Sequence, residues 1–333
     1  MAGARAGGAE LFFERLTAAL QRSGETVLPV IRRDAARAAR LRAAGLAPVP
    51  LGFGGALDLL TRPRLGRVLR RFEPRVAVSW MNRAAAATPR GGWVRVGRLG
   101  GYYDLRYYRG FDHLVGNTRG IVGWIRAQGW PAERVHHLPN FAPDLMEIGA
   151  APVRLAPGPV VLALGRLHGN KAFDVLIRAL ALLPEAHLVI AGDGPERVAL
   201  ERLGEELGVS RRLSMPGWRA DIAGLLAGCD VLVCPSRVEP LGNVILEAFS
   251  AGRPVVAAAV AGPVELIDPG RTGVLVPPED PVRLAGAIGA VLADRGLSAG
   301  LAAAGRAEWE AAHAEAPVVL RWRETMAAIA GVG

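Results

Sequence analysis

The stretch Val231-Leu-Val-Cys-Pro-Ser-Arg-Val-Glu-Pro-Leu-Gly-Asn-Val-Ile-Leu-Glu-Ala248 decides the fold class of this chain, because it predicts a strand, a loop and a helix in direct succession. Its first four residues form an apolar run, as expected for a strand that is buried on both faces. The next seven contain two prolines and are therefore expected to form a loop. From Gly242 onward the apolar residues recur at helical spacing.

The same alternation of short apolar runs with helical segments continues on both sides of this stretch. The further runs are residues 159–165, 188–192, 213–217, 252–257 and 273–277. Strands that alternate with helices build a parallel sheet with helices on both faces. The sequence therefore predicts an α/β protein with a doubly wound parallel sheet.

Two glutamates, Glu239 and Glu247, lie in the predicted loop and in the helix that follows it. In open parallel sheets, ligands bind beyond the carboxyl ends of the strands, and the unpaired N–H groups of a helix start attract phosphate. Glu247 lies one turn after Asn243, and Gly242 lets a ligand approach the backbone. The two carboxylates could accept hydrogen bonds from one polyhydroxylated ligand. The spacing by itself favours two ordinary solvated charges, so the interpretation depends on the surrounding residues.

A second pair of charged residues follows the predicted strand at 159–165. Arg166 and Lys171 lie in the loop after it, and Lys171 is the only lysine among 40 basic residues. All the other basic residues are arginines. The lysine at this position is therefore either chance or a place that requires a compact ammonium group instead of a planar guanidinium. Together the two cations could bind a diphosphate. The alternative is a surface loop with ordinary charges.

Six motifs occur in a fixed order in this half of the chain. They are Gly165-Arg-Leu with Lys171, Gly192-Asp-Gly-Pro195, Pro216-Gly-Trp218, Glu239-Pro-Leu-Gly-Asn-Val-Ile-Leu-Glu-Ala248, Gly252-Arg-Pro-Val-Val and Gly273-Val-Leu-Val-Pro-Pro278. The series resembles the C-terminal half of family 4 glycosyltransferases, a retaining group with the GT-B fold, and covers about residues 158 to 300. The resemblance implies two Rossmann-like doubly wound domains that face a cleft.

The resemblance also implies a role for each matching position. Arg166 and Lys171 would neutralise the donor diphosphate. Glu239 would contact hydroxyls of the donor sugar, and Glu247 would accept hydrogen bonds from the ribose. The other positions expected to border the donor are Gly165, Trp218, Leu241, Gly242, Asn243 and Val244.

The chemistry of a nucleotide sugar requires such cations. Cleavage of a glycosyl phosphate bond leaves a nucleoside diphosphate with about three negative charges, and preorganised cations that face this charge are usually the largest catalytic contribution. No Asp-x-Asp occurs in the chain, and the resemblance implies an enzyme with neither metal nor cofactor. A glycosidase with Glu239 and Glu247 about 5 Å apart as nucleophile and acid is a minor alternative, because it has no use for the two cations.

Gly7 and Gly8 precede a predicted amphipathic helix and resemble the glycine loop of the same family, whose backbone approaches the donor diphosphate. The family begins with a strand before this loop, whereas only six residues precede Gly7. We therefore expect an N-terminal domain that lacks its first strand and has unpaired strand edges, with a misassigned or truncated start as the favoured reason.

The acceptor side departs from the family pattern. Many relatives have a histidine near the end of the strand that here ends in Leu99-Gly-Gly-Tyr102, and no histidine of this chain lies there. Tyr102, Tyr103 and Asp104 are the polar groups at that place, and Asp104 is a candidate to orient or deprotonate the acceptor hydroxyl. Structural roles are the alternative. Asn140, after the last strand of this half, is a further acceptor-side candidate.

The length of 333 residues and the apolar content of 51% fit two domains with substantial cores. We expect an acceptor-side domain over 1–145, a nucleotide-sugar-binding domain over 146–305, and helices over 306–333 that pack back on the first domain. Residues 142–159, rich in Ala, Pro and Gly, are the expected linker. The two cysteines flank one strand and are expected to be buried.

The charge is unevenly distributed. Residues 1–150 carry 23 arginines and 11 acidic residues, whereas residues 151–333 carry 17 basic and 20 acidic residues. Two Arg-rich segments, 32–42 and 62–75, contain interleaved apolar residues and suit contact with anionic lipid headgroups. The alternative is that arginines simply decorate exposed helices. No nucleic-acid recognition motif accompanies them.

The sequence contains no apolar run of the length needed to span a membrane. We expect a cytoplasmic protein, either free or at the inner face of the cytoplasmic membrane. The leading hypothesis is a retaining glycosyltransferase that moves a sugar from a nucleoside diphosphate donor to a glycan or lipid-linked acceptor, as in the synthesis of lipopolysaccharide or another cell-envelope polysaccharide. The alternative is a non-catalytic, basic surface-binding protein on a degenerate GT-B scaffold, which the absent strand and histidine would explain.

Overall fold

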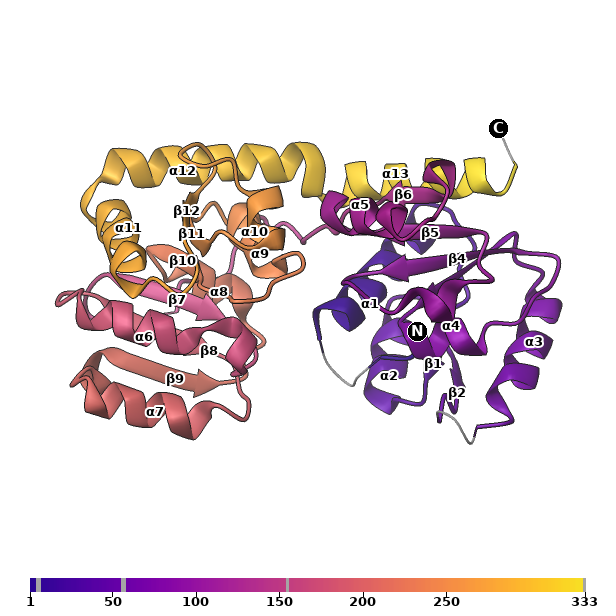
Figure 1. Cartoon of the computed structure of the whole chain (residues 1–333), viewed down its shortest axis with the longest axis horizontal. Coiled ribbons are helices and arrows are strands. Elements are labelled where there is room, and N and C mark those ends of the chain that lie inside the picture. Colours follow the sequence, from indigo (N-terminus) through magenta and orange to yellow (C-terminus); the bar gives the residue numbers. More distant parts are fainter. Residues whose placement is uncertain (4–6, 55–57, 154–155, 332–333) are drawn as a thin grey trace. The chain divides into compact units, whose positions relative to one another are not determined.

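A computed structural model of the chain describes residues 1–3, 7–54, 58–153 and 156–331. The chain divides into two units (Figure 1). Unit 1 comprises Met1–Phe141 with Glu315–Gly333, and unit 2 comprises Ala142–Ala314. Both are α/β structures in which all neighbouring strands run parallel, which confirms the predicted fold class.

Unit 2 is built on one six-stranded sheet. Its strands are β7 (Val160–Leu164), β8 (His187–Ala191), β9 (Leu213–Gly217), β10 (Val231–Cys234), β11 (Val255–Ala258) and β12 (Val274–Val276). Their order across the sheet is β12-β11-β10-β7-β8-β9. The chain therefore moves outward from β7 in one direction and then returns to the other side of β7 with β10. The point where the order reverses lies between β7 and β10, and this is where open α/β sheets bind ligands.

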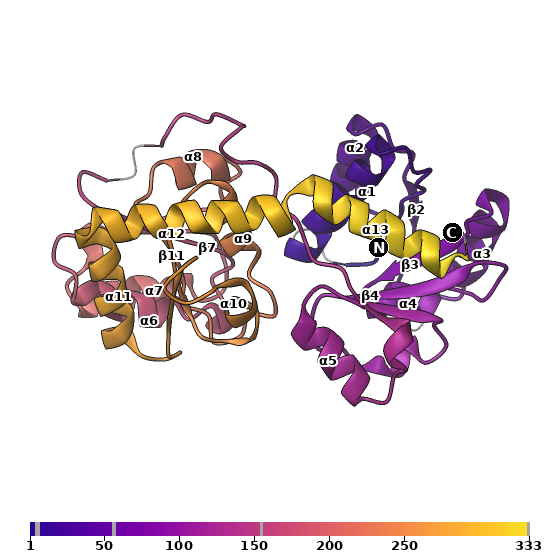
Figure 2. The same cartoon turned by 90° about the horizontal axis from the view of Figure 1, so that it is seen from above.

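Strand β7 is fully buried because apolar helices cover both faces of the sheet. Val161 and Ala163 belong to one hydrophobic cluster, whereas Leu162 and Leu164 belong to another. The first cluster includes residues of α6 (Phe173–Ala181), α7 (Arg197–Glu206), α11 (Pro281–Ala293) and α12 (Arg295–Glu308). The second includes residues of α8 (Ile222–Ala227), α9 (Asn243–Ser250) and α10 (Ala261–Leu266). Helix α12 also runs past α9, as Figure 2 shows.

Unit 1 contains two separate parallel sheets. The larger has the order β3 (Val76–Trp80), β4 (Val94–Leu99), β5 (His113–Gly116) and β6 (Val135–His137), and the smaller pairs β1 (Val30–Arg32) with β2 (Val49–Leu51). The helices of this unit are α1 (Gly8–Arg22), α2 (Ala35–Ala43), α3 (Thr61–Phe72), α4 (Asn82–Ala87), α5 (Arg119–Ala127) and α13 (Glu315–Ile329).

Aromatic side chains form the centre of unit 1. Trp80 of β3 stacks on Trp322 of α13, with ring centroids 6.3 Å apart and planes 9° from parallel. Phe12 of α1 lies 5.9 Å from Trp80 and 5.4 Å from Phe141. The last helix of the chain is therefore a component of the core that the first helix also builds.

Within the described residues no strand precedes α1, as the sequence analysis expects. The backbone of Met1 instead pairs with β1: its amino group donates to the carbonyl oxygen of Val30 at 2.7 Å, and its carbonyl oxygen accepts from Arg32 N–H at 2.9 Å. Met1 and Ala2 are both buried.

The apolar residues of the two Arg-rich segments pack inside the protein, contrary to the expectation that they contact lipid. Leu41 of α2 and Leu65 and Leu69 of α3 lie in hydrophobic clusters of the core. Arg37 is also buried, and its Nε donates to Glu14 Oε1 at 2.9 Å. The arginines of α3 are exposed. The apolar stripe of each helix is used for folding, because the same amphipathic pattern fits a protein core and a membrane surface.

No single helix in the described ranges has the length and apolar character needed to cross a membrane, although the bent pair Pro281–Ala293 and Arg295–Ile329 passes by length and composition. Cys229 and Cys234 are free and buried, as expected. Residues 142–153, assigned to a linker from the sequence, belong to unit 2, where Leu145 and Val153 pack against its core.

Candidate active site

Two loops meet at the point where the strand order of unit 2 reverses. One follows β7 and spans residues 165–172, and the other follows β10 and spans residues 235–242. The carbonyl oxygen of Asn170 in the first loop accepts from the N–H groups of Arg237 and Val238 in the second, at 2.8 and 3.2 Å. The loops are thus joined through their backbones.

Arg237 reinforces this junction. Its guanidinium donates to the carbonyl oxygen of Gly169 at 2.8 Å and makes a two-pronged contact with the Asp174 carboxylate, with both distances 2.7 Å. A further ion pair joins it to Glu279. The hydrogen bond from Arg237 lowers the pKa of Asp174. Arg237 could not be predicted from the sequence, because its partners come from segments far apart in the chain.

Lys171 and Glu239, one from each loop, form an ion pair. Lys171 Nζ lies 2.5 Å from Glu239 Oε2, and the side chains are 26% and 11% exposed. Burial alone would lower the pKa of Lys171, but the Glu239 carboxylate outweighs this effect, and the pKa is raised. Lys171 therefore remains an ammonium ion at neutral pH. The structure brings these two predicted residues together, whereas Arg166 lies exposed in the first loop.

The Gly192-Asp-Gly motif after β8 is required by a close backbone contact. A Cβ at Gly192 would lie 1.8 Å from the carbonyl oxygen of Gly165, and one at Gly194 would lie 2.3 Å from that of Leu167. Leu167 N–H in turn donates to the carbonyl oxygen of Asp193 at 3.0 Å. Gly165 itself has a φ of 147°, which favours glycine. The loop that carries Arg166 and Lys171 is therefore fixed from its other side.

The second loop ends at the N-terminus of α9. Gly242 occupies the cap position with a φ of 97° and, having no side chain, cannot itself cap the first amide groups of the helix. Gly262 N–H donates to the carbonyl oxygen of Glu239 at 2.8 Å. A Cβ at Gly262 would lie 2.3 Å from the carbonyl oxygen of Leu241. This close approach fixes the loop backbone on which Glu239 lies.

Two other donor-side residues lie on neighbouring elements. Glu247 is partly buried in α9, one turn after Asn243. Trp218 follows β9 and is 67% exposed, after Gly217 with a φ of 83°. All donor-side residues predicted from the six motifs therefore lie on loops that follow strands of unit 2 or on the helix after β10.

In unit 1, Gly7 caps α1 and Gly8 begins it. Gly7 is exposed, and a Cβ there would lie 2.5 Å from Glu10 Oε2, at the end of a flexible side chain. Asn140 is 2% exposed, and its Oδ1 accepts from Arg98 Nη2 at 2.7 Å. The structure thus shows a structural contact for Asn140, and its acceptor-side role stays a prediction.

Arg98 is a buried cation that the sequence analysis did not single out. It is 3% exposed, and its Cζ lies 4.6 Å from the centroid of the Trp80 ring and 5.5 Å from that of Phe12. Its Nε has no hydrogen-bond partner among the described atoms. Burial lowers the pKa of Arg98 to about 10. A charged residue near the end of β4 was the available indication, because that strand is otherwise apolar apart from Arg95 and Gly97.

The candidates after β4 have different environments. Tyr102 is 48% exposed and meets the ring of Trp124 edge-on at 5.5 Å. Tyr103 is packed against the apolar core of unit 1, and burial raises its pKa. Asp104 accepts from Arg106 N–H at 2.9 Å and forms an ion pair with the Arg106 guanidinium. The structure therefore places the Asp104 carboxylate in a local helix cap.

Comparison with known proteins defines the family. Residues 158–294 match the model of glycosyl transferases group 1. The chain is 36% identical over 311 residues to the lipopolysaccharide core biosynthesis glycosyltransferase LpsE of Rhizobium meliloti (strain 1021), with 90% of this chain and 89% of the relative covered. It is 34% identical over 307 residues to LpsD of the same organism, with the same coverage. The chain belongs to the group 1 glycosyltransferases.

The fold agrees with this assignment. The structure of Anabaena Alr3699/HepE in complex with UDP superposes with a TM-score of 0.84 at 24% sequence identity, over 98% of both chains. The protein is a glycosyltransferase with the GT-B fold. Similarity to two glycosyltransferases over 90% of the chain gives no support to the alternative of a non-catalytic surface-binding protein.

Proposed function

We propose that this protein transfers a sugar, with retention of anomeric configuration, from a nucleoside diphosphate donor to a glycan or lipid-linked acceptor in the synthesis of lipopolysaccharide core. The observation that carries the proposal is the Lys171–Glu239 pair at the reversal point of the unit 2 sheet. Two relatives named as lipopolysaccharide core biosynthesis glycosyltransferases and a structural neighbour in complex with UDP support it.

The donor diphosphate is expected to bind between the two loops. Lys171 and Arg166 supply positive charge, and the amide groups at the start of α9 supply hydrogen-bond donors. A diphosphate competes with Glu239 for the Lys171 ammonium and frees one carboxylate oxygen for the hydroxyls of the donor sugar. Glu247 accepts from the ribose, and the backbone around Trp218 borders the base.

The transfer step forms one bond and breaks another at the anomeric carbon. The acceptor hydroxyl oxygen attacks this carbon from the side of the leaving group, while the bond to the diphosphate oxygen breaks. The hydroxyl proton passes to the departing phosphate, so no histidine is needed. Lys171 and Arg166 stabilise the charge that develops on the diphosphate.

We further propose that the reaction needs no metal ion or cofactor. The support is that two cations already lie on the loop after β7 and that the sequence has no Asp-x-Asp. Full activity after treatment with a strong chelator is the expected result. Loss of activity that returns on addition of a divalent cation would refute this part of the proposal.

Donor binding tests the proposal directly. A panel of nucleoside diphosphate sugars should include one that raises the melting temperature of the full chain. Lys171→Ala should weaken binding of every diphosphate donor alike, and Glu239→Ala should reduce transfer by about 10² to 10³. Glu206→Ala on α7 is a matched control, because among the described residues Glu206 forms an ion pair only with the exposed Arg202. A panel with no stabilising donor, or variants that behave as the control does, would contradict the proposal.

We also propose that the protein works in the cytoplasm at the inner face of the cytoplasmic membrane. The exposed arginines of α3 support electrostatic contact with anionic headgroups, without insertion of the apolar residues that the core uses. Binding to anionic vesicles should weaken strongly between low and physiological salt. Salt-independent binding, or none, would contradict this contact.

A further inference from the structure

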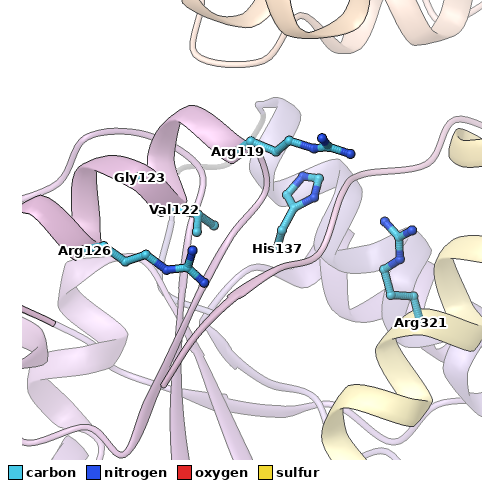
Figure 3. Close-up of a pocket in the computed structure, with 6 residues that line it drawn as sticks. All are labelled: Arg119, Val122, Gly123, Arg126, His137 and Arg321. Carbon is cyan, nitrogen blue, oxygen red and sulfur yellow. The ribbon is translucent and has the colours of Figure 1, made fainter. Parts of the chain in front are cut away.

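A basic pocket lies in unit 1, on residues that the donor site does not use. Its volume is about 500 Å³, and it is lined by Arg119, Val122, Gly123, Arg126, His137 and Arg321. Four of the six lining residues are basic, and none is acidic. In Figure 3 the side chains of Arg119 and His137 lie together, and those of Arg126 and Arg321 reach toward them from either side.

The lining residues come from three separate elements. Arg119 and Arg126 are the first and next-to-last residues of α5, seven positions apart and therefore on one helical face. His137 ends β6, and Arg321 extends from α13. Residues 119 and 321 are so distant in the chain that only folding brings their charges into one pocket. This group could not be predicted from the sequence, and it lies outside both Arg-rich segments.

Local contacts hold α5 and Arg126 in place. The Thr118 side chain caps α5 by accepting from Ile121 N–H at 3.2 Å, and Ile121 and Ile125 are fully buried. Arg126 Nη2 donates to the carbonyl oxygens of Ala132 and Val135 at 3.2 and 3.1 Å. These bonds use one amino group of the guanidinium. One of the pocket's cations is therefore fixed in position before any ligand binds.

The electrostatics of the pocket favour an anion. Three guanidinium groups line one space, and an anion bound there is attracted by all three. Guanidinium groups bind tetrahedral oxyanions through two parallel N–H···O bonds, and the positive end of the α5 dipole adds to this attraction. A volume of about 500 Å³ accommodates more than one phosphate-sized group.

We propose that the pocket formed by Arg119, Arg126, His137 and Arg321 binds the phosphate group of an anionic ligand, a phosphate monoester or diester. The phosphate belongs either to a soluble phosphorylated glycan or to a lipid headgroup. Both have the same recognition chemistry. All residues that line this pocket belong to unit 1, whereas Arg166, Lys171 and Glu239 belong to unit 2.

The first test is titration of the full chain with inorganic phosphate, followed by calorimetry. Arg119→Gln and Arg321→Gln should each weaken phosphate binding about tenfold, and the pair together should weaken it further. Arg323→Gln is the matched control on the same helix, because Arg323 pairs with Glu25 and does not line the pocket. Lys171→Ala is the control for phosphate bound at the donor loops, and it should leave this binding unchanged.

Vesicle sedimentation distinguishes the two sources of the phosphate. If Arg119→Gln and Arg321→Gln also lose binding to phosphatidylglycerol vesicles, relative to phosphatidylcholine vesicles, the ligand is a lipid headgroup. If vesicle binding is unchanged while phosphate binding is lost, the ligand is a soluble phosphorylated glycan. The proposal is overturned if the wild-type protein does not bind phosphate, or if both pocket variants bind it as tightly as Arg323→Gln does. These outcomes are independent of donor binding.

Discussion

Lys171 is the only lysine in the chain, and its surroundings explain why an arginine would not suit this position. Its Nζ is in contact with Glu239, and the methylene carbon Cε lies 3.5 Å from where a Cβ of Gly165 would be. A compact ammonium fits between the two loops and can turn from one acceptor to another. A planar guanidinium has a fixed fork of donors and needs more space.

Lys171→Arg should therefore impair transfer although the charge is kept. We expect kcat/KM for the donor to fall by about 10- to 100-fold, because the diphosphate loses a cation at the right position. Steady-state kinetics with a cognate donor measure this effect. Arg178→Lys on α6 exchanges the same two residue types at an exposed position and should change little. Equal activity of both variants would show that Lys171 acts only through its charge.

Arg98 and Asn140 should be coupled in stability. Asn140→Leu removes the recorded acceptor of a buried guanidinium and should lower the free energy of unfolding by about 2 kcal/mol. In the Asn140→Leu background, Arg98→Met should destabilise the protein less than it does in the wild type, because the cation has already lost this partner. Urea unfolding of the four variants in the cycle measures the coupling. Additive effects would mean that the hydrogen bond contributes nothing to stability.

Single residues could be selected from the sequence where a motif contains them, and not where the fold brings them together. Lys171 and Glu239 each stand in a recognisable motif, and the structure brings them together. Arg237 and the pocket arginines lie next to residues that are distant in the chain, so the sequence alone does not single them out. A buried arginine such as Arg98 contradicts the usual exposure of charge and was overlooked for that reason.

At the scale of elements, the glycine turn after β8 determines the position of the donor loop. Gly192→Ala places a Cβ 1.8 Å from the carbonyl oxygen of Gly165, and backbone must move to accommodate it. We expect a loss of at least about 2 kcal/mol of stability together with weaker donor binding. Gly300→Ala in the middle of α12 meets no atom and should stabilise by about 0.5–1 kcal/mol. Thermal unfolding with and without donor tests both; a neutral Gly192→Ala would show that the β7 loop is not fixed by this contact.

The elements of unit 2 were predicted closely because a strand buried on both faces appears as a continuous apolar run. The run at 231–234 is strand β10, and the run at 159–165 contains β7. Helix α3 shows where this approach fails. Its amphipathic pattern is real, but an apolar stripe is the same whether it faces a core or a lipid surface, and here Leu65 and Leu69 face the core.

At the scale of the whole molecule, the division of charge follows the two units. Unit 1 carries 25 basic and 11 acidic residues, whereas unit 2 carries 15 basic and 20 acidic residues. The unit with the Lys171–Glu239 pair is thus net acidic, and its attraction for a diphosphate depends on local cations. The basic character of the chain belongs to unit 1, which also contains the pocket proposed to bind phosphate.

The C-terminal helix should stabilise unit 1 specifically. Trp322 is 1% exposed and stacks on Trp80, so Trp322→Ala should destabilise this unit by about 3–5 kcal/mol. Hydrogen exchange should show faster exchange of the β3 and β4 amides, while β7 and β10 keep their protection. Trp322→Phe is the conservative control. Equal loss of protection in both units would show that they unfold as one.

The return of α13 to unit 1 also has a consequence for synthesis on the ribosome. Residues 142–314 form a continuous segment, and all of unit 2 is therefore available once that segment has been translated. The core of unit 1 lacks Val318, Val319 and Trp322 until the final helix emerges. The half of the chain that is translated first is thus the last to complete its core, and a nascent chain stalled before residue 315 would carry a folded unit 2 beside an unfinished unit 1.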